Sequence, residues 1–417
     1  MRSRKMITGA VGLVAVLALS GCAGGAGEGG GAVELSWSFW GNADTASQYQ
    51  EVIDAFEAKN PDIKINPTYA DWDPYWQKRS TEAAGGGLPD VMTFDVAYLA
   101  QFASRGALLD LGKYDEIDLS QFSDDALSTT SLDGVVYGAP TAANSWAMLY
   151  NADLLAEIGV SFPDAPYTWS EYQDFISEVT EKSGGAYYGG PDYAYRIQTL
   201  ELQLRQEGEN LFTDDGQLNF DEKRLTEFWS STAALRDGGS VSPQNENDQI
   251  QPAFPISKPI AVSEMLWDNM GPLLESETAP NLEIAPPPTD HPDVPAGYLK
   301  TSSLISASAK TQHPEEAAAF IDFLVNSPEV AEILGTLSGV PLSAEQAASL
   351  ADDPTGLVEY QESVADSMGA PPPPPVAGFG TIEASFLRLA EEIGLGTISV
   401  DDAVKTFFSE AEGTLNG

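Results

Sequence analysis

One stretch near the middle of the chain, residues 137–151, constrains the fold more than any other part of the sequence. It follows the β-branched run Val135–Tyr137 and ends with the apolar run Trp146–Tyr150, so both flanks are typical of strands. Pro140 and the small or polar residues Thr141–Asn144 lie between them. A plain hairpin fits this pattern, and so does a strand that leaves one sheet and enters another. We favour the second interpretation, a hinge between two lobes, because the segments on either side each have the pattern of an α/β unit.

The segment before the hinge alternates between strand and helix patterns. The predicted elements are strand Glu34–Trp40, a helix that stops at Asn60-Pro61, strand Ile63–Tyr69, helix Asp73–Ala84, strand Val91–Asp95 and a short helix that stops at Gly106. This order predicts a mostly parallel sheet with helices on both faces.

The segment after the hinge contains more helix. The predicted helices are Asn151–Ile158, a helix from the capping box Thr168-Trp-Ser-Glu171 to Ser183, one marked by Ile197 and Leu204, Asp221–Asp237, and one marked by Ala317 and Leu324. The predicted strands are Ala186–Gly189, Pro259–Leu266, Ile284–Ala285 and Ser302–Ile305. The segment Leu211–Phe220 has a hairpin turn, and the ligand spacing of a calcium loop is absent. The prolines of Ala370–Gly380 favour polyproline II, and we expect a stiff loop that spans a cleft.

The N-terminus has the pattern of a secretory leader. Arg2, Arg4 and Lys5 precede the apolar run Ile7–Leu19, which is short for a membrane span. Leu19-Ser-Gly-Cys22 resembles a bacterial lipobox, so we expect residues 1–21 to be a lipoprotein signal peptide and Cys22 to be acylated. The alternative is an ordinary secretory signal followed by a chance cysteine. Residues 22–32 are rich in glycine and predict a flexible linker.

Charge and cysteine content exclude several kinds of partner. The formal net charge is −43, and without residues 1–21 the chain has 17 Lys and Arg against 63 Asp and Glu, or −46. Such a surface repels nucleic acid and anionic lipid headgroups, so no nucleic-acid partner is expected. Cys22 is the only cysteine, which excludes a disulfide framework, an iron–sulfur cluster and a thiolate zinc site. We expect neither a metal nor a cofactor.

Several motifs occur in an order that resembles one family. After the lipobox come Leu35-Ser-Trp-Ser-Phe-Trp-Gly41, Tyr49 to Pro61, Gly87-Leu-Pro-Asp-Val91, Asp133 to Pro140, Leu149 to Leu154, Thr168-Trp-Ser-Glu171 and Gly339-Val-Pro341. They resemble the extracellular solute-binding proteins, family 1, of bacterial ATP-driven sugar importers, the group that includes maltose-binding protein. The resemblance covers nearly the whole mature chain. Each motif is weak alone, and their shared order carries the assignment.

The resemblance implies a two-lobed α/β fold of the periplasmic-binding-protein type (type II), each lobe a mostly parallel sheet flanked by helices. Three crossovers are expected near Thr141–Ser145, Glu283–Pro288 and Asn326–Pro328. Lobe 1 would comprise 33–141 and 288–326, and lobe 2 would comprise 145–283 and 328–417. The implied function is capture of a sugar or oligosaccharide in the cleft and its delivery to the permease subunits of an ABC importer. The protein would be a monomer on the outer face of the cell membrane, anchored through acylated Cys22.

Candidate ligand-binding residues follow strand ends, where open α/β sheets bind ligands. By this rule the candidates are Trp40, Gly41, Asn42, Asp95, Asn144, Trp146, Trp267 and Asp268. Family position supports Asn144 and Trp267, adds Tyr193 and Tyr195, and suggests that Phe379 or Phe386 closes the cleft. Indole faces suit the apolar face of a sugar ring, and amide and carboxylate oxygens suit its hydroxyls.

Structural roles compete at several of these positions. Asp95 and Asp268 are each placed to cap the helix that follows. Trp37 and Trp229 fit core faces, whereas Trp72 and Trp76 fit either a core or a cleft.

Two other functions remain open from the residues. Paired carboxylates with tryptophans are also typical of a secreted glycoside hydrolase. Against catalysis, the chain shows no eightfold β-α repeat, and His291 and His313 each adjoin a proline in apparent loops. We therefore expect a binding protein that is not an enzyme. The third possibility is the same fold with a different solute, such as a polyamine drawn by acidic residues.

Overall fold

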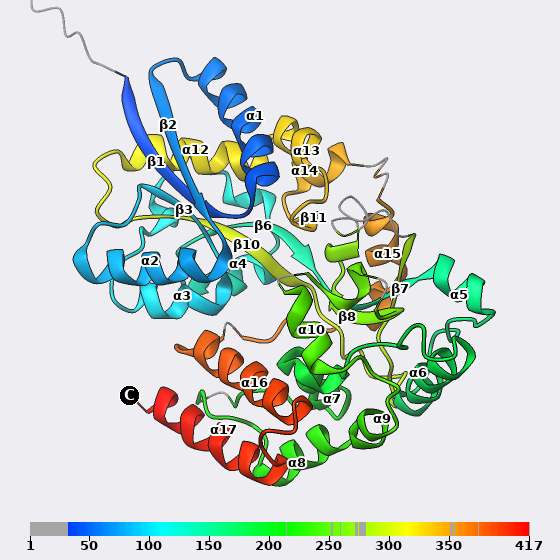
Figure 1. Cartoon of the computed structure of the whole chain (residues 1–417). Coiled ribbons are helices and arrows are strands. Elements are labelled where there is room, and N and C mark those ends of the chain that lie inside the picture. The colour runs from blue at the N-terminus through cyan, green and yellow to red at the C-terminus, as the bar shows by residue number, and fades with distance from the viewer. Residues whose placement is uncertain are drawn as a thin grey trace, which may run out of the picture.

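The computed structural model describes residues 32–416 except for 214, 252, 259, 272, 273, 275–280, 351, 352, 354 and 374. The predicted signal peptide, Cys22 and all of the predicted linker except residue 32 therefore lie outside the described residues. Figure 1 shows two groups of elements, each built around its own sheet.

The first group is a six-stranded sheet with helices on both faces, here called the six-stranded half. Its strands, in spatial order, are β11 (Val340–Pro341), β6 (Ala139–Asn144), β10 (Lys300–Ala307), β3 (Val91–Phe94), β1 (Val33–Trp40) and β2 (Ile63–Ala70). The helices of this half are α1 (Ala43–Lys59), α2 (Trp72–Gly85), α3 (Val96–Ala103), α4 (Asp124–Thr129), α12 (Pro314–Asn326), α13 (Pro328–Leu334) and α14 (Ala344–Ser349). A two-stranded ribbon, β4 (Ser131–Leu132) with β5 (Val135–Val136), precedes β6.

Strand alternation explains how the helices of this half are arranged. Leu35, Trp37 and Phe39 of β1 point to one face and pack with α1 and α12. On the other face, α2 and α3 pack against side chains of β3. Both faces are thus covered, as Figure 1 shows, and the predicted alternation of Leu35, Trp37 and Phe39 in β1 is confirmed.

The direction of the strands corrects the prediction of mostly parallel sheets. β1 runs parallel to β2 and β3, but β10 is antiparallel to both β3 and β6, and β11 is antiparallel to β6. The reason is that β10 enters this sheet from the other half of the molecule. It begins at the edge where β1 and β3 end, so it must run in the opposite sense.

The second group, here called the three-stranded half, is built on an antiparallel sheet in the order β8 (Ser263–Trp267), β7 (Trp146–Asn151) and β9 (Leu282–Ala285). Its main helices are α5 (Ala152–Ile158), α6 (Trp169–Lys182), α7 (Ile197–Gln206), α8 (Glu222–Ser230), α9 (Ala233–Asp237), α10 (Gln244–Ile250), α15 (Leu357–Ser363), α16 (Phe379–Gly394) and α17 (Val400–Leu415). The predicted capping box at Thr168 and Glu171 is confirmed at the start of α6. The strand predicted at Ala186–Gly189 forms only isolated bridges, at Tyr188 and Gly190.

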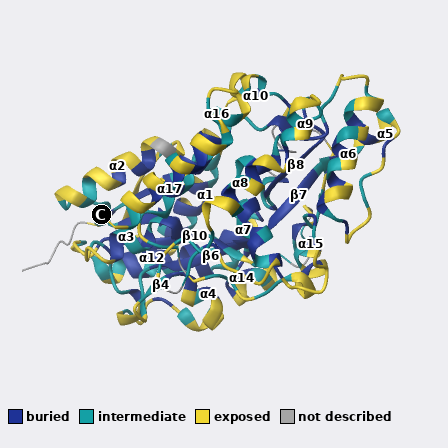
Figure 2. Cartoon of the chain, turned by 90° about the horizontal axis from the view of Figure 1, so that it is seen from below, coloured by how far each residue is buried: buried dark blue, intermediate teal, exposed yellow. Residues whose placement is uncertain are grey.

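Short 3-10 helices complete the described elements. They are η1 (Leu111–Lys113), η2 (Leu119–Gln121), η3 (Tyr193–Tyr195), η4 (Pro255–Ser257) and η5 (Ala365–Ser367). In Figure 2 the buried residues follow the two sheets, and the exposed residues follow the outer faces of the helices. Along the described residues, no helix combines the length and the apolar composition that a membrane crossing needs.

The central stretch passes from one sheet to the other, as the hinge interpretation predicts. β6 belongs to the six-stranded sheet, β7 belongs to the three-stranded sheet, and Ser145 alone separates them. The connection is shorter than expected, because Pro140 and Thr141–Asn144 lie within β6. Small residues suit this strand, which pairs with β10 on one side and β11 on the other.

The chain returns to the six-stranded sheet between β9 and β10, within residues 286–299. The last passage lies later than Asn326–Pro328. There, Pro328 only ends α12 and starts α13, and β11 still pairs with β6. The next helix to pack on the three-stranded half is α15, whose Leu357 lies against Ala147 of β7.

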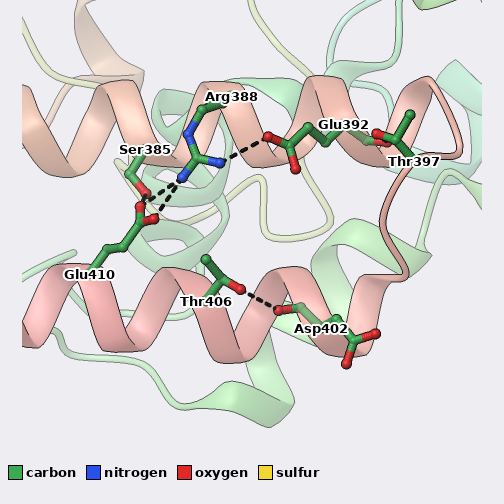
Figure 3. Close-up of polar contacts among 7 residues, drawn as sticks. All are labelled: Ser385, Arg388, Glu392, Thr397, Asp402, Thr406 and Glu410. Atoms are coloured by element: carbon green, nitrogen blue, oxygen red, sulfur yellow. Dashed lines mark hydrogen bonds and ion pairs between the residues drawn. The ribbon is translucent and has the colours of Figure 1, made fainter.

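The C-terminal helices α16 and α17 form a hairpin on the three-stranded half. Phe386 and Phe407 join its core, which also contains Trp229. Figure 3 shows Arg388 of α16 bridging Glu392 on its own helix and both carboxylate oxygens of Glu410 on α17, at 2.8 Å. The Arg388 side chain is 45% exposed, so the apolar contacts contribute more to this pairing than the ion pairs do.

Candidate functional site

A large cavity of about 860 Å³ lies between the two halves and is lined by both of them. The six-stranded half contributes the ends of β1, β3 and β6 and the start of β10, where the strand-end rule places a site. The three-stranded half contributes the end of β8, the start of α7 and the start of α16. The cavity size falls in the range of small-molecule sites.

Aromatic side chains form opposite parts of the cavity wall. Trp40 and Trp72 meet edge to face at 5.0 Å on the six-stranded side, and Trp72 is 41% exposed. On the other side Trp267 packs edge to face on Trp146 at 5.2 Å, and Phe379 packs on Phe212 at 5.8 Å. Aromatic faces from both halves are therefore available to a ligand with an apolar surface.

Trp76 has a different role from Trp72. It is buried at 4% exposure and stacks on Tyr98 at 3.7 Å between ring centroids. Of the two tryptophans that fitted either a core or a cleft, Trp72 lines the cavity and Trp76 belongs to the core.

Asp95 is both a helix cap and a partner of a cation in the cavity wall. One carboxylate oxygen accepts from the Ala97 backbone N–H at 2.8 Å at the start of α3. The other pairs with Lys300 Nζ at 3.1 Å, and Lys300 also lies 5.0 Å from the Trp267 ring centroid. The capping alternative is therefore correct, and Asp95 still lines the cavity. The pair fixes the start of β10 beside the end of β3.

The strand-end rule did not predict one group of polar side chains in the cavity wall. Glu201 accepts a hydrogen bond from Tyr298 Oη at 2.8 Å, and Gln198 donates to Glu383 at 2.5 Å. Burial raises the pKa of Glu201, although the hydrogen bond from Tyr298 opposes the rise. Four residues on α7, α16 and the segment before β10 thus place amide, phenol and carboxylate groups at the cavity. Strand ends could not predict these residues, because they lie on helices and on the segment between β9 and β10. The only sequence feature that pointed to a shared surface was the i, i+3 spacing of Gln198 and Glu201.

Arg196 is another cavity residue that sequence patterns missed. Its guanidinium lies 4.8 Å from the Tyr195 ring centroid, and its Nε is buried without a hydrogen-bond partner among the described residues. Burial opposes its charge, but Tyr195 and then Glu264 raise its pKa. The residue is therefore a charged donor at the cavity with hydrogen-bonding capacity to spare.

The two asparagines predicted for the site line the cavity but already have local partners. Asn42 caps α1 by accepting from the backbone N–H groups of Asp44 and Thr45, each at 3.0 Å. The Asn144 amide, oriented to satisfy its neighbours, donates to Ala143 O at 2.8 Å and to Ser338 O at 3.2 Å. Gly41 also lines the cavity, at a φ of 149°.

Four predicted ligand-binding residues lie outside the main cavity. Tyr193 is 3% exposed and accepts from Gln173, and Tyr195 donates to Glu264 at 2.6 Å. Trp146 is 8% exposed behind Trp267, and Asp268 is fully buried against Ser145. Tyr195, Trp146 and Asp268 adjoin residues that do line the cavity, so a shift of one position or one layer explains those three differences, whereas Tyr193 packs on Trp169 and Tyr172 in the core. Phe386 is likewise a core residue, and Phe379 is the one that reaches the cavity.

The proline-rich segment forms part of the cavity wall, but both of its ends lie on the three-stranded half, so its predicted span across the cleft stays a prediction. Pro371, Pro372, Pro373, Pro375 and Val376 line the cavity. The segment starts where Arg205 donates to Ala370 O at 2.8 Å, and it ends where α16 begins. Within the described residues, no group of three or more His, Cys, Asp and Glu side chains is placed to hold a metal ion.

Comparison with known proteins agrees with this architecture. The sequence profile of the family described as bacterial extracellular solute-binding protein matches residues 51–358. An arabinooligosaccharide-binding protein of Bacillus subtilis is 29% identical over 180 residues, which are 41% of each chain.

Two solved structures show the same fold. An extracellular solute-binding protein family 1 structure from Alicyclobacillus acidocaldarius has a TM-score of 0.67 and 28% identity, covering 93% of this chain and 99% of that one. A periplasmic oligogalacturonide-binding protein from Yersinia enterocolitica, in complex with saturated digalacturonic acid, has a TM-score of 0.81 and 21% identity. It covers 92% of this chain and 99% of the other.

Proposed function

Because this chain belongs to the bacterial extracellular solute-binding protein family, we propose that it captures a sugar or oligosaccharide in the cavity between its two halves and delivers it to the permease of an ABC importer. Members of this family bind solutes and are not catalytic, so the hydrolase alternative is set aside.

The observation that carries the proposal is the pairing of aromatic and hydrogen-bonding groups around one cavity. Trp40 and Trp72 on one side and Trp267 on the other offer flat apolar faces. Gln198, Glu201 and other polar groups offer donors and acceptors beside them. A sugar ring has a C–H face and equatorial hydroxyls, so it matches both kinds of group at once.

The charges of the wall disfavour a polyamine. Asp95 is already paired with Lys300, and Glu201 and Glu383 share the cavity with Arg196. A polyamine needs carboxylates without a cation beside them. The sugars bound by the relatives from B. subtilis and Y. enterocolitica support an oligosaccharide as the ligand.

A thermal-shift screen tests the ligand class. The mature chain is mixed with arabino-oligosaccharides, galacturonides, neutral hexose oligosaccharides and spermidine, and the melting temperature is recorded for each. A ligand at 100 times its Kd adds about 2.7 kcal/mol to the unfolding free energy, which is a shift of several degrees. We expect a shift with an oligosaccharide; a shift with spermidine alone would contradict the proposal.

Trp267 should contribute most to affinity among the tryptophans of the wall, because Trp146 and Lys300 hold its ring in place. We expect Trp267→Ala to raise the Kd of the sugar on the order of tenfold, through lost stacking and lost apolar contact. Trp72→Ala should act in the same direction. Isothermal titration measures both variants.

Tyr69 provides the matched control for these truncations. It is 50% exposed, stacks on Phe39 and lies outside the cavity. Tyr69→Ala should leave the Kd unchanged. An equal loss of affinity in Tyr69→Ala and Trp267→Ala would place the sugar elsewhere.

We also propose that the protein is held at the outer face of the cell membrane through acylated Cys22. The support is the basic start of the leader, its apolar run and the Leu19-Ser-Gly-Cys22 sequence. Mass spectrometry of the protein extracted from membranes tests this directly, since a diacylglyceryl group on residue 22 is expected. Recovery of an unmodified chain in the soluble fraction would contradict it.

A further inference from the structure

The single-residue passage between the two sheets is held by one buried carboxylate. Ser145 and Asp268 are both fully buried. The Asp268 backbone N–H donates to Ser145 O at 3.0 Å, and Asp268 Oδ2 accepts from both the Ser145 N–H at 3.0 Å and the Ser145 hydroxyl at 2.8 Å. Three hydrogen bonds therefore join Asp268 to Ser145, the single residue between β6 and β7.

A third segment of the chain joins the same carboxylate. Gln361 of α15 donates to Asp268 Oδ2 at 2.8 Å and to Ala143 O, at the end of β6, at 3.0 Å. The helix α15 packs on β7 through Leu357 and Ala147. Asp268 thus ties together the passage at Ser145, the segment after β8 and the helix that follows the last passage.

The chain on either side of Asp268 forms part of the cavity wall. Trp267, Asn269 and Met270 all line the cavity, whereas Asp268 points away from it into the junction. Asn269 also donates to Leu337 O, in the six-stranded half, at 3.3 Å. A displacement of this wall segment by a ligand would therefore be transmitted to Ser145 through Asp268.

We propose that Asp268 is a positioning residue that couples the cavity wall at 267–270 to the passage at Ser145 and thereby sets the angle between the two halves. It does not touch the ligand. Its carboxylate orients the passage, so that the aromatic faces of the two halves oppose each other across the cavity. The coupling itself does not depend on the proposed function. Only its expected effect on ligand affinity rests on that function.

A second aspartate supplies a control of the same chemistry. Asp90 accepts from the Ser36 N–H at 2.9 Å, from the Ser36 hydroxyl at 2.7 Å and from the Thr311 hydroxyl at 2.7 Å. All three residues belong to the six-stranded half, and none lines the cavity. Replacing Asp90 by Ala therefore removes hydrogen bonds of the same kind as those of Asp268, but leaves the passage at Ser145 unchanged.

Förster transfer between two labels measures the angle without any sugar. The labels are placed at Gln77→Cys on α2 and Ser409→Cys on α17, which are exposed and lie in different halves, in the full mature chain carrying Cys22→Ser. Inter-label distance distributions are compared for the parent and for Asp268→Ala, Asp268→Asn, Gln361→Ala and Asp90→Ala. Because no ligand is needed, a failed sugar screen and a failed distance measurement are separate results.

We expect the inter-label distance distribution of the parent to have one narrow peak. This peak should be absent in Asp268→Ala and broader in Gln361→Ala. Asp268→Asn should retain the peak, because an amide keeps one acceptor oxygen and can place its NH₂ where Oδ1 has no partner. Asp90→Ala should lower the melting temperature and leave the peak unchanged. The proposal is overturned by a parent-like distribution in Gln361→Ala, or by equal broadening in Asp90→Ala, which would indicate general destabilisation.

Discussion

At the scale of single residues, burial separates aspartates that look alike in the sequence. Asp268 has three donors to one oxygen, but its other oxygen is buried without a partner, and burial raises its pKa from 3.8 to about 6. The titratable side chain that faces it from α15 is Tyr360, whose pKa is raised chiefly by burial. Asp90 has the opposite shift: burial opposes its charge, but the bonds from Ser36 and Thr311 lower its pKa. Each carboxylate accepts three hydrogen bonds, so the opposite pKa shifts come from the deeper burial of Asp268 and from its second oxygen, which has no partner, whereas both oxygens of Asp90 have one.

This difference predicts a pH dependence of stability with a defined sign. Since the folded pKa of Asp268 is raised, its favourable contribution is complete below the unfolded pKa of 3.8 and is lost as pH rises through about 6. A shift of roughly 2 units corresponds to about 3 kcal/mol. The unfolding free energy of Asp268→Asn, relative to the parent, should therefore increase between pH 4 and pH 7 by about that amount.

Urea denaturation at a series of pH values measures this effect. Asp90→Asn serves as the control, because its lowered pKa gives the opposite sign: the contribution of Asp90 is present above its unfolded pKa and is lost as pH falls. A relative stability of Asp268→Asn that does not change across this range would contradict the assigned shift.

At the scale of elements, the end of β6 is held by the loop that leads into β11. Asn144 donates to Ser338 O, and Gly339 follows with a φ of 112°. A Cβ on Gly339 would lie 2.0 Å from the terminal amide group of Asn144 and 2.4 Å from Ala143 O. The glycine thus allows two backbones to approach at the cavity edge.

Gly339→Ala should destabilise the protein by about 1–3 kcal/mol, through backbone strain and displacement of Asn144. Gly335→Ala is the matched control, because Gly335 also has a positive φ of 54° but nothing lies within 4 Å of its Cβ position. Thermal unfolding should show a smaller loss for Gly335→Ala. Equal losses would mean that conformation alone, and not the close approach, requires glycine at position 339.

The elements also show what the sequence could predict. Alternation placed β1 and β2, each of which has apolar residues on one face, whereas β3 is buried on both faces and does not alternate. Alternation did not predict β6, because Pro140 and the small residues after it are typical of a loop. This segment is a strand because it pairs with β10 on one side and with β11 on the other, and that pairing outweighs its low intrinsic strand propensity. Strand ends found Trp40, Asp95 and Trp267, but no strand-based rule points to Glu201 or Tyr298, which helix and crossing segments bring to the cavity.

At the scale of the whole molecule, the two halves have separate cores and meet around one cavity. The helices of each half bury residues on their own sheet, and the largest cluster of the three-stranded half includes α16 and α17. Closure about Ser145 is therefore possible without disturbing either core, and a ligand that contacts both halves stabilises the closed arrangement by its differential affinity. The mostly parallel order expected for both sheets was wrong because strands that arrive from the other half must enter at the cavity edge.

The central claim is that an oligosaccharide lies in this cavity between aromatic faces from both halves. A crystal structure grown with the sugar that gives the largest thermal shift tests it most directly. The account predicts density for sugar rings against Trp267 on one side and Trp40 or Trp72 on the other, with hydroxyls at Arg196 or Glu201. Ordered sugar bound outside the cavity, with these side chains untouched, would contradict it.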